Sequence, residues 1–339
     1  MASRPAPAGA TDSERLGAGD LSPLIRAITM PAPQAHAAWR KWRASVDVDQ
    51  LGGQTLQLIP VLGGRLTNWL RDDPAAGVFR GILRRAWTET QLRLSVFRSV
   101  SAELEQAGCG PVLAAGSLVV CLLNRLPDSV RPIYDIRLII RRSSLARAAE
   151  VLQAGGWRLS GSLPAGEELD WAASAHFSRQ GISLMLQWRA LPGPVERAAV
   201  IEAEFLDHSR SIECRGLRLQ APGPEHVLLA ALCGRYDFDA DAIPWQVDAA
   251  LLPLDAIVWR RWRKLADDLA PEAFGRLRQM RQLGLAVPRI RRPAPPLAVR
   301  VAPHVTRMRK FYYTWRGRGG RIYRRLKRAA NSALRSRYR

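Results

Sequence analysis

The residues best suited to carry chemistry are Asp135 and Arg137, which stand two positions apart in the segment Arg-Pro-Ile-Tyr-Asp-Ile-Arg that begins at Arg131. The branched residues of 133–140 predict a strand. Alternate strand residues point to the same face, so the carboxylate and the guanidinium should lie side by side. A carboxylate can ligate a divalent cation, and a guanidinium can pair with a phosphate. The alternative is that Asp135 forms only a surface ion pair with Arg137 or Arg131, which would contribute little.

A second candidate lies upstream, where the apolar run 111–115 ends in Gly116 and Ser117. The pattern predicts a strand that gives way to a helix at these two residues. Backbone N–H groups at a helix N-terminus bind phosphate, so Gly116 and Ser117 could cradle a phosphate with Arg137 as its fixed counter-charge. The alternative is an ordinary strand-to-helix turn in which Ser117 is the N-cap.

Other candidates for metal sites are weaker. No two histidines stand four residues apart, so a histidine metal site is not expected, and for His226, which follows Glu225, we expect a solvated or capping role. No cysteine belongs to a Cys-x-x-Cys pair, which predicts free thiols in a reducing compartment rather than zinc or disulfides. Asp237, Asp239 and Asp241 resemble a calcium loop but lack its glycine and closing glutamate. The histidines are His36, His176, His208, His226 and His304, and the cysteines are Cys109, Cys121, Cys214 and Cys233.

The periodicity of the chain predicts an α+β fold, in which a small mixed sheet is flanked by N-terminal and C-terminal helical regions. Hairpins are expected to turn at 179–181 and 215–216, and a helix is expected between a Ser143 cap and Gly155-Gly156. The expected regions are a disordered leader at 1–20, helices at 21–106, an α/β core at 107–220, helices at 221–288, and a basic linker and tail at 289–339.

Positive charge is concentrated at the C-terminus. The net charge is +21, no acidic residue follows Glu272, and 289–339 contains seventeen Lys or Arg among aromatic rings. Such a tail suits RNA or single-stranded DNA, or an anionic membrane surface; the alternative is a solubilising tail. The longest apolar run, 111–123, is too short to span a bilayer, and the N-terminus has no apolar signal segment, so a cytoplasmic location is expected.

Several short motifs occur in an order that resembles an uncharacterised bacterial nucleotidyltransferase family of the polymerase-beta superfamily. The resemblance extends over about residues 21–288, and the basic tail lies outside it. The features that carry it are Trp39, Leu58-Ile-Pro60, Trp87, the turn at Gly116, the R-P-x-x-D-I segment from Arg131, Gly156-Trp157, Pro224-Glu-His-Val-Leu-Leu229 and Trp245-Gln-Val-Asp248.

The resemblance implies a transferase in which three carboxylates hold Mg²⁺ ions that act on a nucleoside triphosphate. Asp135 matches the first acid, the expected metal ligand and catalytic residue, but Arg137 stands in place of the second and Met185 in place of the third. Gln187 replaces a histidine of the family pattern, and Ala115 replaces a lysine. One carboxylate of three cannot hold two divalent cations, and a guanidinium there repels them.

The sequence therefore predicts a nucleotidyltransferase-like protein with a degenerate metal site. If it is active, it would use Mg²⁺ to move a nucleoside monophosphate from a nucleoside triphosphate to an unknown acceptor. The alternatives are a non-catalytic nucleotide-binding or scaffolding relative, and a nucleic-acid or membrane-surface binding module driven by the tail.

Overall fold

The computed structural model describes residues 21–290, except 125, 127, 192–196, 215–216 and 234–242. The expected leader and nearly all of the basic tail lie outside the described residues, as do the turn at 215–216 and the aspartates at 237, 239 and 241. The chain divides into two units, 1–290 and 291–339, and the description below concerns the first.

The described residues contain one seven-stranded mixed sheet, with the strand order β3-β4-β5-β2-β1-β7-β6. The pairs β2/β5 and β1/β7 are parallel, and the other neighbours are antiparallel. Together with the flanking helices, this sheet confirms the α+β prediction. The strands are β1 Leu113–Ala115, β2 Asp135–Ile139, β3 Arg158–Leu159, β4 Ser174–Arg179, β5 Ile182–Gln187, β6 Ser209–Cys214 and β7 Leu217–Pro222.

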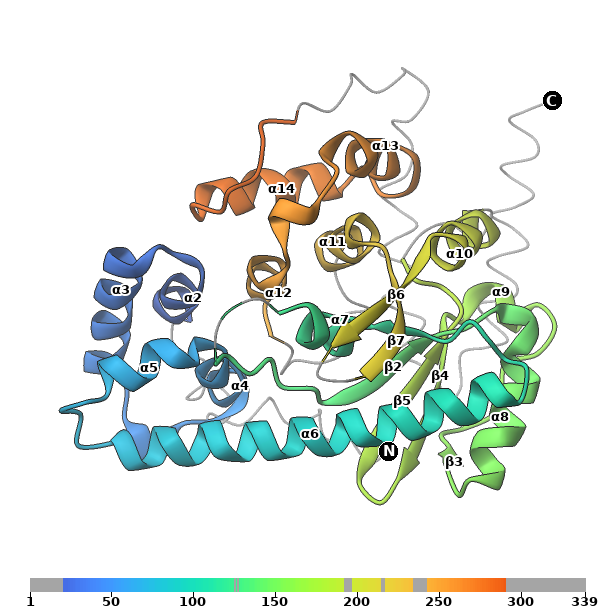
Figure 1. Ribbon diagram of the computed structural model, residues 1–339, viewed down its shortest axis with the longest axis horizontal. Coiled ribbons are helices and arrows are strands. Elements are labelled where there is room, and N and C mark those ends of the chain that lie inside the picture. Colours follow the sequence, from blue (N-terminus) through green and yellow to red (C-terminus); the bar gives the residue numbers. More distant parts are fainter. Residues whose placement is uncertain are drawn as a thin grey trace, which may run out of the picture. The chain divides into compact units, whose positions relative to one another are not determined.

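The N-terminal helices pack around a group of aromatic rings. Trp39 stacks on Trp69 and meets Phe79 edge to face, with ring centroids 5.9 and 5.5 Å away. The last helix of this region, α6, has 31 residues and runs along the sheet (Figure 1). The elements are α2 Ser22–Thr29, α3 Ala32–Ser45, the 3₁₀ turn η1 Val48–Gln50, α4 Gly53–Leu62, α5 Gly64–Trp69 and α6 Ala76–Gln106.

Helices cover both faces of the sheet (Figure 1). α6 contacts β2 and α8 on one face, whereas α7, α11 and α12 contact one another on the other face. The remaining elements are α7 Gly116–Leu123, η2 Arg142–Ser144, α8 Leu145–Ala154, α9 Glu168–Trp171, α10 Ala198–Asp207, α11 Pro224–Cys233, α12 Trp245–Leu251, η4 Leu254–Ala256, α13 Trp259–Leu269 and α14 Ala273–Gln282.

The expected helix after β2 has the predicted end but not the predicted start. α8 ends at Gly155, its C-cap, and Gly156 follows with φ +82°, as glycines at a helix end commonly do. At the other end Ser144 occupies the N-cap and makes no side-chain hydrogen bond, so the prediction of a Ser143 cap was wrong. The 3₁₀ turn η2 directly precedes α8, and Ser143 is the middle residue of this turn.

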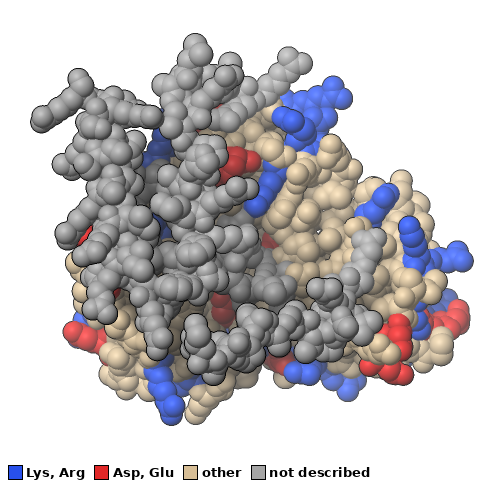
Figure 2. All heavy atoms as spheres, turned by 180° about the vertical axis from the view of Figure 1, so that it is seen from behind, with Lys and Arg blue, Asp and Glu red and all other residues tan. Residues whose placement is uncertain are grey.

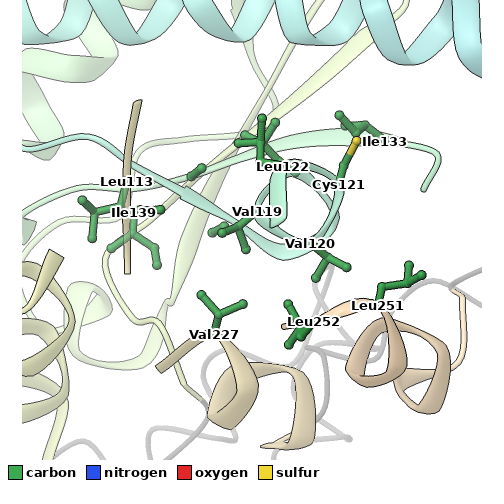
Figure 3. Packing of buried hydrophobic residues seen from close by; sticks show 14 of the residues in the cluster. Leu113, Val119, Val120, Cys121, Leu122, Ile133, Ile139, Val227, Leu251 and Leu252 are labelled. Carbon is green, nitrogen blue, oxygen red and sulfur yellow. The ribbon is translucent and has the colours of Figure 1, made fainter. Parts of the chain in front are cut away.

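α7 is part of the core, and its residues 118–122 are all apolar and buried. Figure 3 shows Val119 and Val120 directed toward Val227 of α11 and Leu252 after α12, while Cys121 lies beside Ile133. Cys109, Cys121 and Cys233 are buried free thiols, and burial raises the pKa of Cys109 and of Cys233.

Charged side chains of both signs lie at the surface of the described residues, with Lys and Arg interspersed among Asp and Glu on the face that Figure 2 shows. In the described part of the chain, no helix is both long enough and apolar enough to cross a bilayer.

Candidate functional site

A cavity opens on the α7 face of the sheet, where β1 ends and α7 begins. Its volume is about 280 Å³, near the lower limit of about 300 Å³ for small-molecule pockets. The four residues predicted to form a site, Gly116, Ser117, Asp135 and Arg137, all line it. The polar lining is completed by Gln57, Arg131, Tyr134, Gln187 and Asp248.

Asp135 and Arg137 lie on the same face of β2, and their side chains bond to each other. Arg137 Nε lies 2.5 Å from Asp135 Oδ2, and both side chains are mostly buried, at 13 and 15% exposure. On the neighbouring strand β5, Ser183 stands beside Asp135 and Met185 beside Arg137. Ala115 of β1 flanks Arg137 on its other side. The pair is therefore largely shielded from water, unlike the surface ion pair that was the alternative.

Gly116 brings Arg137 onto the N-terminus of α7. Its φ is +57°, in the left-handed region that favours glycine, and a Cβ at this position would lie 2.6 Å from Arg137 Cδ. Only a residue without a side chain allows the arginine to cross the helix terminus so closely. Gly116 therefore serves both the turn and the placement of the Arg137 side chain.

The start of α7 has no side-chain cap. Ala115 occupies the N-cap and offers no side-chain hydrogen bond, so the alternative in which Ser117 is the cap was wrong. Ser117 lies in the first turn instead, where its Oγ is buried and, within the part of the chain that the structure describes, has no hydrogen-bond partner. The first N–H groups of a helix lack partners within the helix and carry partial positive charge. An anion in the cavity could accept hydrogen bonds from these groups, from Ser117 Oγ and from Arg137.

These residues do not fit the paired Mg²⁺ ions that the resemblance implies. Asp135 is bonded to Arg137, and the other carboxylate of the cavity, Asp248, is bonded to Arg131 with N–O distances of 2.6 and 3.2 Å. In the part of the chain that the structure describes, Asp135 belongs to no group of three potential metal ligands. A hard cation with a strict demand for oxygen ligands would meet two carboxylates already neutralised by guanidinium groups.

A cluster that the sequence analysis missed lies between α10 and α11. Glu204, His208 and His226 bring one ligand atom each within 4.8 Å of one another. His226 is fully buried, so the expectation of a solvated or capping role was wrong. The available signal was Glu204 with His208, four residues apart, which a search for pairs of histidines overlooks.

Comparisons with known proteins find a matching family model and distantly similar solved structures. A family model described as uncharacterised nucleotidyltransferase matches residues 74–269. Among solved structures, the antibiotic-resistance factor ANT(2'')-Ia is 11% identical and aligns over 57% of this chain and 97% of its own, with a TM-score of 0.38. An antigenic nucleotidyltransferase-like protein from Paracoccidioides brasiliensis is 14% identical over 41% of this chain and 63% of its own, with a TM-score of 0.28. No curated protein matches the sequence.

Proposed function

Because this chain belongs to a family of uncharacterised nucleotidyltransferases, whose model matches residues 74–269, we propose that it binds a nucleoside triphosphate but transfers the nucleotide poorly or not at all. The phosphate groups would lie in the cavity at the N-terminus of α7, against Gly116, Ser117 and Arg137. The acceptor of any residual transfer is left open.

The observation that carries this proposal is the position of Arg137. Arg137 stands at the sequence position where the family resemblance expects a metal-binding carboxylate, and the lack of a side chain at Gly116 lets the Arg137 side chain pass close to the uncapped start of α7. A fixed cation and a helix N-terminus are both complementary to phosphate. They would neutralise the negative charge of the bound phosphates, as Mg²⁺ does in a transferase. They would not activate an attacking hydroxyl, which Mg²⁺ also does.

Asp135 has a different role in this proposal from the one that the sequence predicts. Its carboxylate is the resting partner of Arg137, so an incoming phosphate must compete with it for the guanidinium. Removing the negative charge should therefore strengthen phosphate binding. In a working two-metal site the same change would weaken the binding of the nucleotide with its metal and abolish transfer.

Calorimetric titration with ATP and GTP, in EDTA and in Mg²⁺, tests the proposal. We expect wild type to bind in both conditions and Asp135→Asn to bind at least as tightly. Arg137→Ala should bind about 10–100-fold more weakly, as for the loss of one charge-assisted hydrogen-bonding partner. Arg158→Ala, at an exposed position of β3, is the matched control and should bind as wild type does.

A transfer assay with labelled nucleoside triphosphate and Mg²⁺ completes the test. We expect wild type and Asp135→Asn to give the same background signal. Transfer by wild type that disappears in Asp135→Asn, together with binding that requires Mg²⁺, would show instead that the chain is an active transferase with Asp135 as a metal ligand.

A further inference from the structure

Outside the cavity, the cluster of Glu204, His208 and His226 brings three metal-ligating side chains together. Glu204 lies near the end of α10, His208 is the residue that ends this helix, and His226 belongs to the first turn of α11. The two helices are neighbours in Figure 1. The chain thus brings a ligand pair spaced i, i+4 and a third ligand from another element to one point.

The donor atoms face one another at close range. His226 Nε2 and His208 Nδ1 each lie 3.1 Å from Glu204 Oε1, and the two imidazole rings stack with centroids 5.7 Å apart. Ligands at about 2.0–2.2 Å from a tetrahedral zinc ion are roughly 3.3–3.5 Å from each other. The two distances to Glu204 would therefore lengthen by only a few tenths of an ångström around an ion, and the two histidine nitrogens already lie within 4.8 Å of each other.

The surroundings favour the ligating form of the buried imidazole. Burial lowers the pKa of His226, the hydrogen bond that His226 donates to Glu204 opposes this, and the nearby Arg261 lowers the pKa further. The neutral ring is the form that binds metals. The charge of Arg261 also opposes a bound cation, and the carboxylate of Glu204 offsets it. His226 Nδ1 is buried and has no hydrogen-bond partner among the described residues, and Nε2 is the ring atom that faces Glu204.

Solvent reaches the cluster from one side. His208 is 45% exposed at its side chain and Glu204 26%, whereas His226 is fully buried. An ion could thus enter past the exposed His208 side chain and bind to the buried His226 on the inner side of the cluster. Phe205, which lines the cavity, packs edge to face against the His226 ring at 5.0 Å, so the cluster adjoins the wall of the cavity without opening into it.

We propose that Glu204, His208 and His226 form a binding site for one first-row divalent transition metal ion, of the Zn²⁺ class. Two imidazoles and one carboxylate suit Zn²⁺, Co²⁺ or Ni²⁺ rather than Mg²⁺ or Ca²⁺, which prefer oxygen ligands. Three protein ligands leave a fourth position for water. The site is separate from Asp135 and does not depend on the proposed nucleotide binding.

The test uses the untagged full-length protein, freed of metal with a chelator and then titrated with Zn²⁺ against a chromophoric competitor, and with Co²⁺ followed by its visible absorption. We expect wild type to bind one ion, to gain the absorption of nitrogen- and oxygen-bound Co²⁺, and to show a Tm that rises with Zn²⁺ concentration. His208→Ala and Glu204→Gln should each lose more than about 100-fold in affinity, a larger loss than changes outside the ligand set cause.

His176→Ala is the matched control, because it removes an exposed histidine of β4 that lies outside the cluster. It should bind Zn²⁺ as wild type does. Since His208 is exposed, its variant is expected to keep the fold, which the circular dichroism of the metal-free protein checks. Absence of tight binding in wild type, or equal binding by wild type and His208→Ala, would overturn the proposal.

Discussion

At the scale of single residues, the site places two positive groups close together, the guanidinium of Arg137 and the N-terminus of α7. Arg137 lies close to the positive end of the α7 dipole. Its charge is balanced by the carboxylate of Asp135, whose Oδ2 lies 2.5 Å from Arg137 Nε. A phosphate in the cavity would meet both positive groups at once. These two groups would attract the phosphate of the proposed function, whereas they would repel a cation.

Gly116 gives this reasoning a direct test. Gly116→Ala places a Cβ 2.6 Å from Arg137 Cδ in a backbone with φ +57°. The left-handed backbone should cost about 1–2 kcal/mol of the free energy of unfolding, and displacement of Arg137 should weaken ATP binding about tenfold or more. Chemical denaturation and calorimetric titration measure the two effects.

The variant Gly181→Ala separates the effect of backbone strain from the effect of displacing Arg137. Gly181 has φ +77° in the turn between β4 and β5, and a Cβ there would have open space. This variant should lose similar stability and keep its ATP affinity. If both variants lose affinity equally, the contact between Gly116 and Arg137 has no part in binding.

The residue scale also shows how far sequence reasoning reaches. The shared face of Asp135 and Arg137 follows from the two-residue period of a strand and could be predicted. The contact of Arg137 with Gly116 could not, because it depends on the register of β1 against β2. His226 joins Glu204 and His208 from another helix, so only the tertiary fold reveals a third ligand.

At the scale of elements, the sheet was predictable where the sequence carries turn residues. The hairpin of β4 and β5 turns at Gln180 and Gly181, both with positive φ, within the segment predicted from the sequence. The start of α8 was mispredicted because serine also suits the 3₁₀ turn that precedes it. The parallel neighbours of β2 and β1 come from distant segments, which periodicity alone cannot pair.

A buried ion pair joins the segment before β2 to α12. Arg131, just before β2, bonds through two nitrogens to Asp248 of α12, and both side chains are less than 10% exposed. Arg131 also donates to the carbonyl of Pro132. Because loss of one partner leaves a buried charge, Arg131→Met should lower the free energy of unfolding by about 3–5 kcal/mol. Urea unfolding measures the change.

The double variant Arg131→Met with Asp248→Leu distinguishes a stranded charge from lost packing. Replacement of a buried pair by apolar residues of similar volume is often neutral, so the double variant should recover most of the stability. A double variant as unstable as Arg131→Met alone would mean that the pair contributes through its other contacts, such as that with Pro132.

At the scale of the whole molecule, charge is divided unequally between the two units of the chain. Residues 291–339 hold 16 Lys or Arg and no acid, so their removal from a net charge of +21 leaves +5. The hydrophobic core lies within the first unit. The unit that carries the nucleotidyltransferase fold should therefore keep its stability without the second unit, and it should lose most of the attraction of the chain for polyanions.

Deletion of residues 291–339 should leave the Tm unchanged and greatly weaken binding to single-stranded RNA. Arginines interleaved in the sequence with Phe311, Tyr312, Tyr313 and Trp315 would offer an RNA both phosphate contacts and stacking surfaces. Release of counterions makes such binding steeply dependent on salt, so the logarithm of the affinity of the full chain should fall linearly with that of the salt concentration, and the truncated chain should show a much shallower slope. Fluorescence anisotropy with labelled RNA at several salt concentrations measures both slopes.

A full-length variant with the tail arginines replaced by glutamine controls for chain length and should behave as the truncated chain does. Pelleting with anionic vesicles is the opposing measurement: a chain that binds vesicles through the tail but shows equal RNA affinity with and without it would identify a membrane surface as the partner instead.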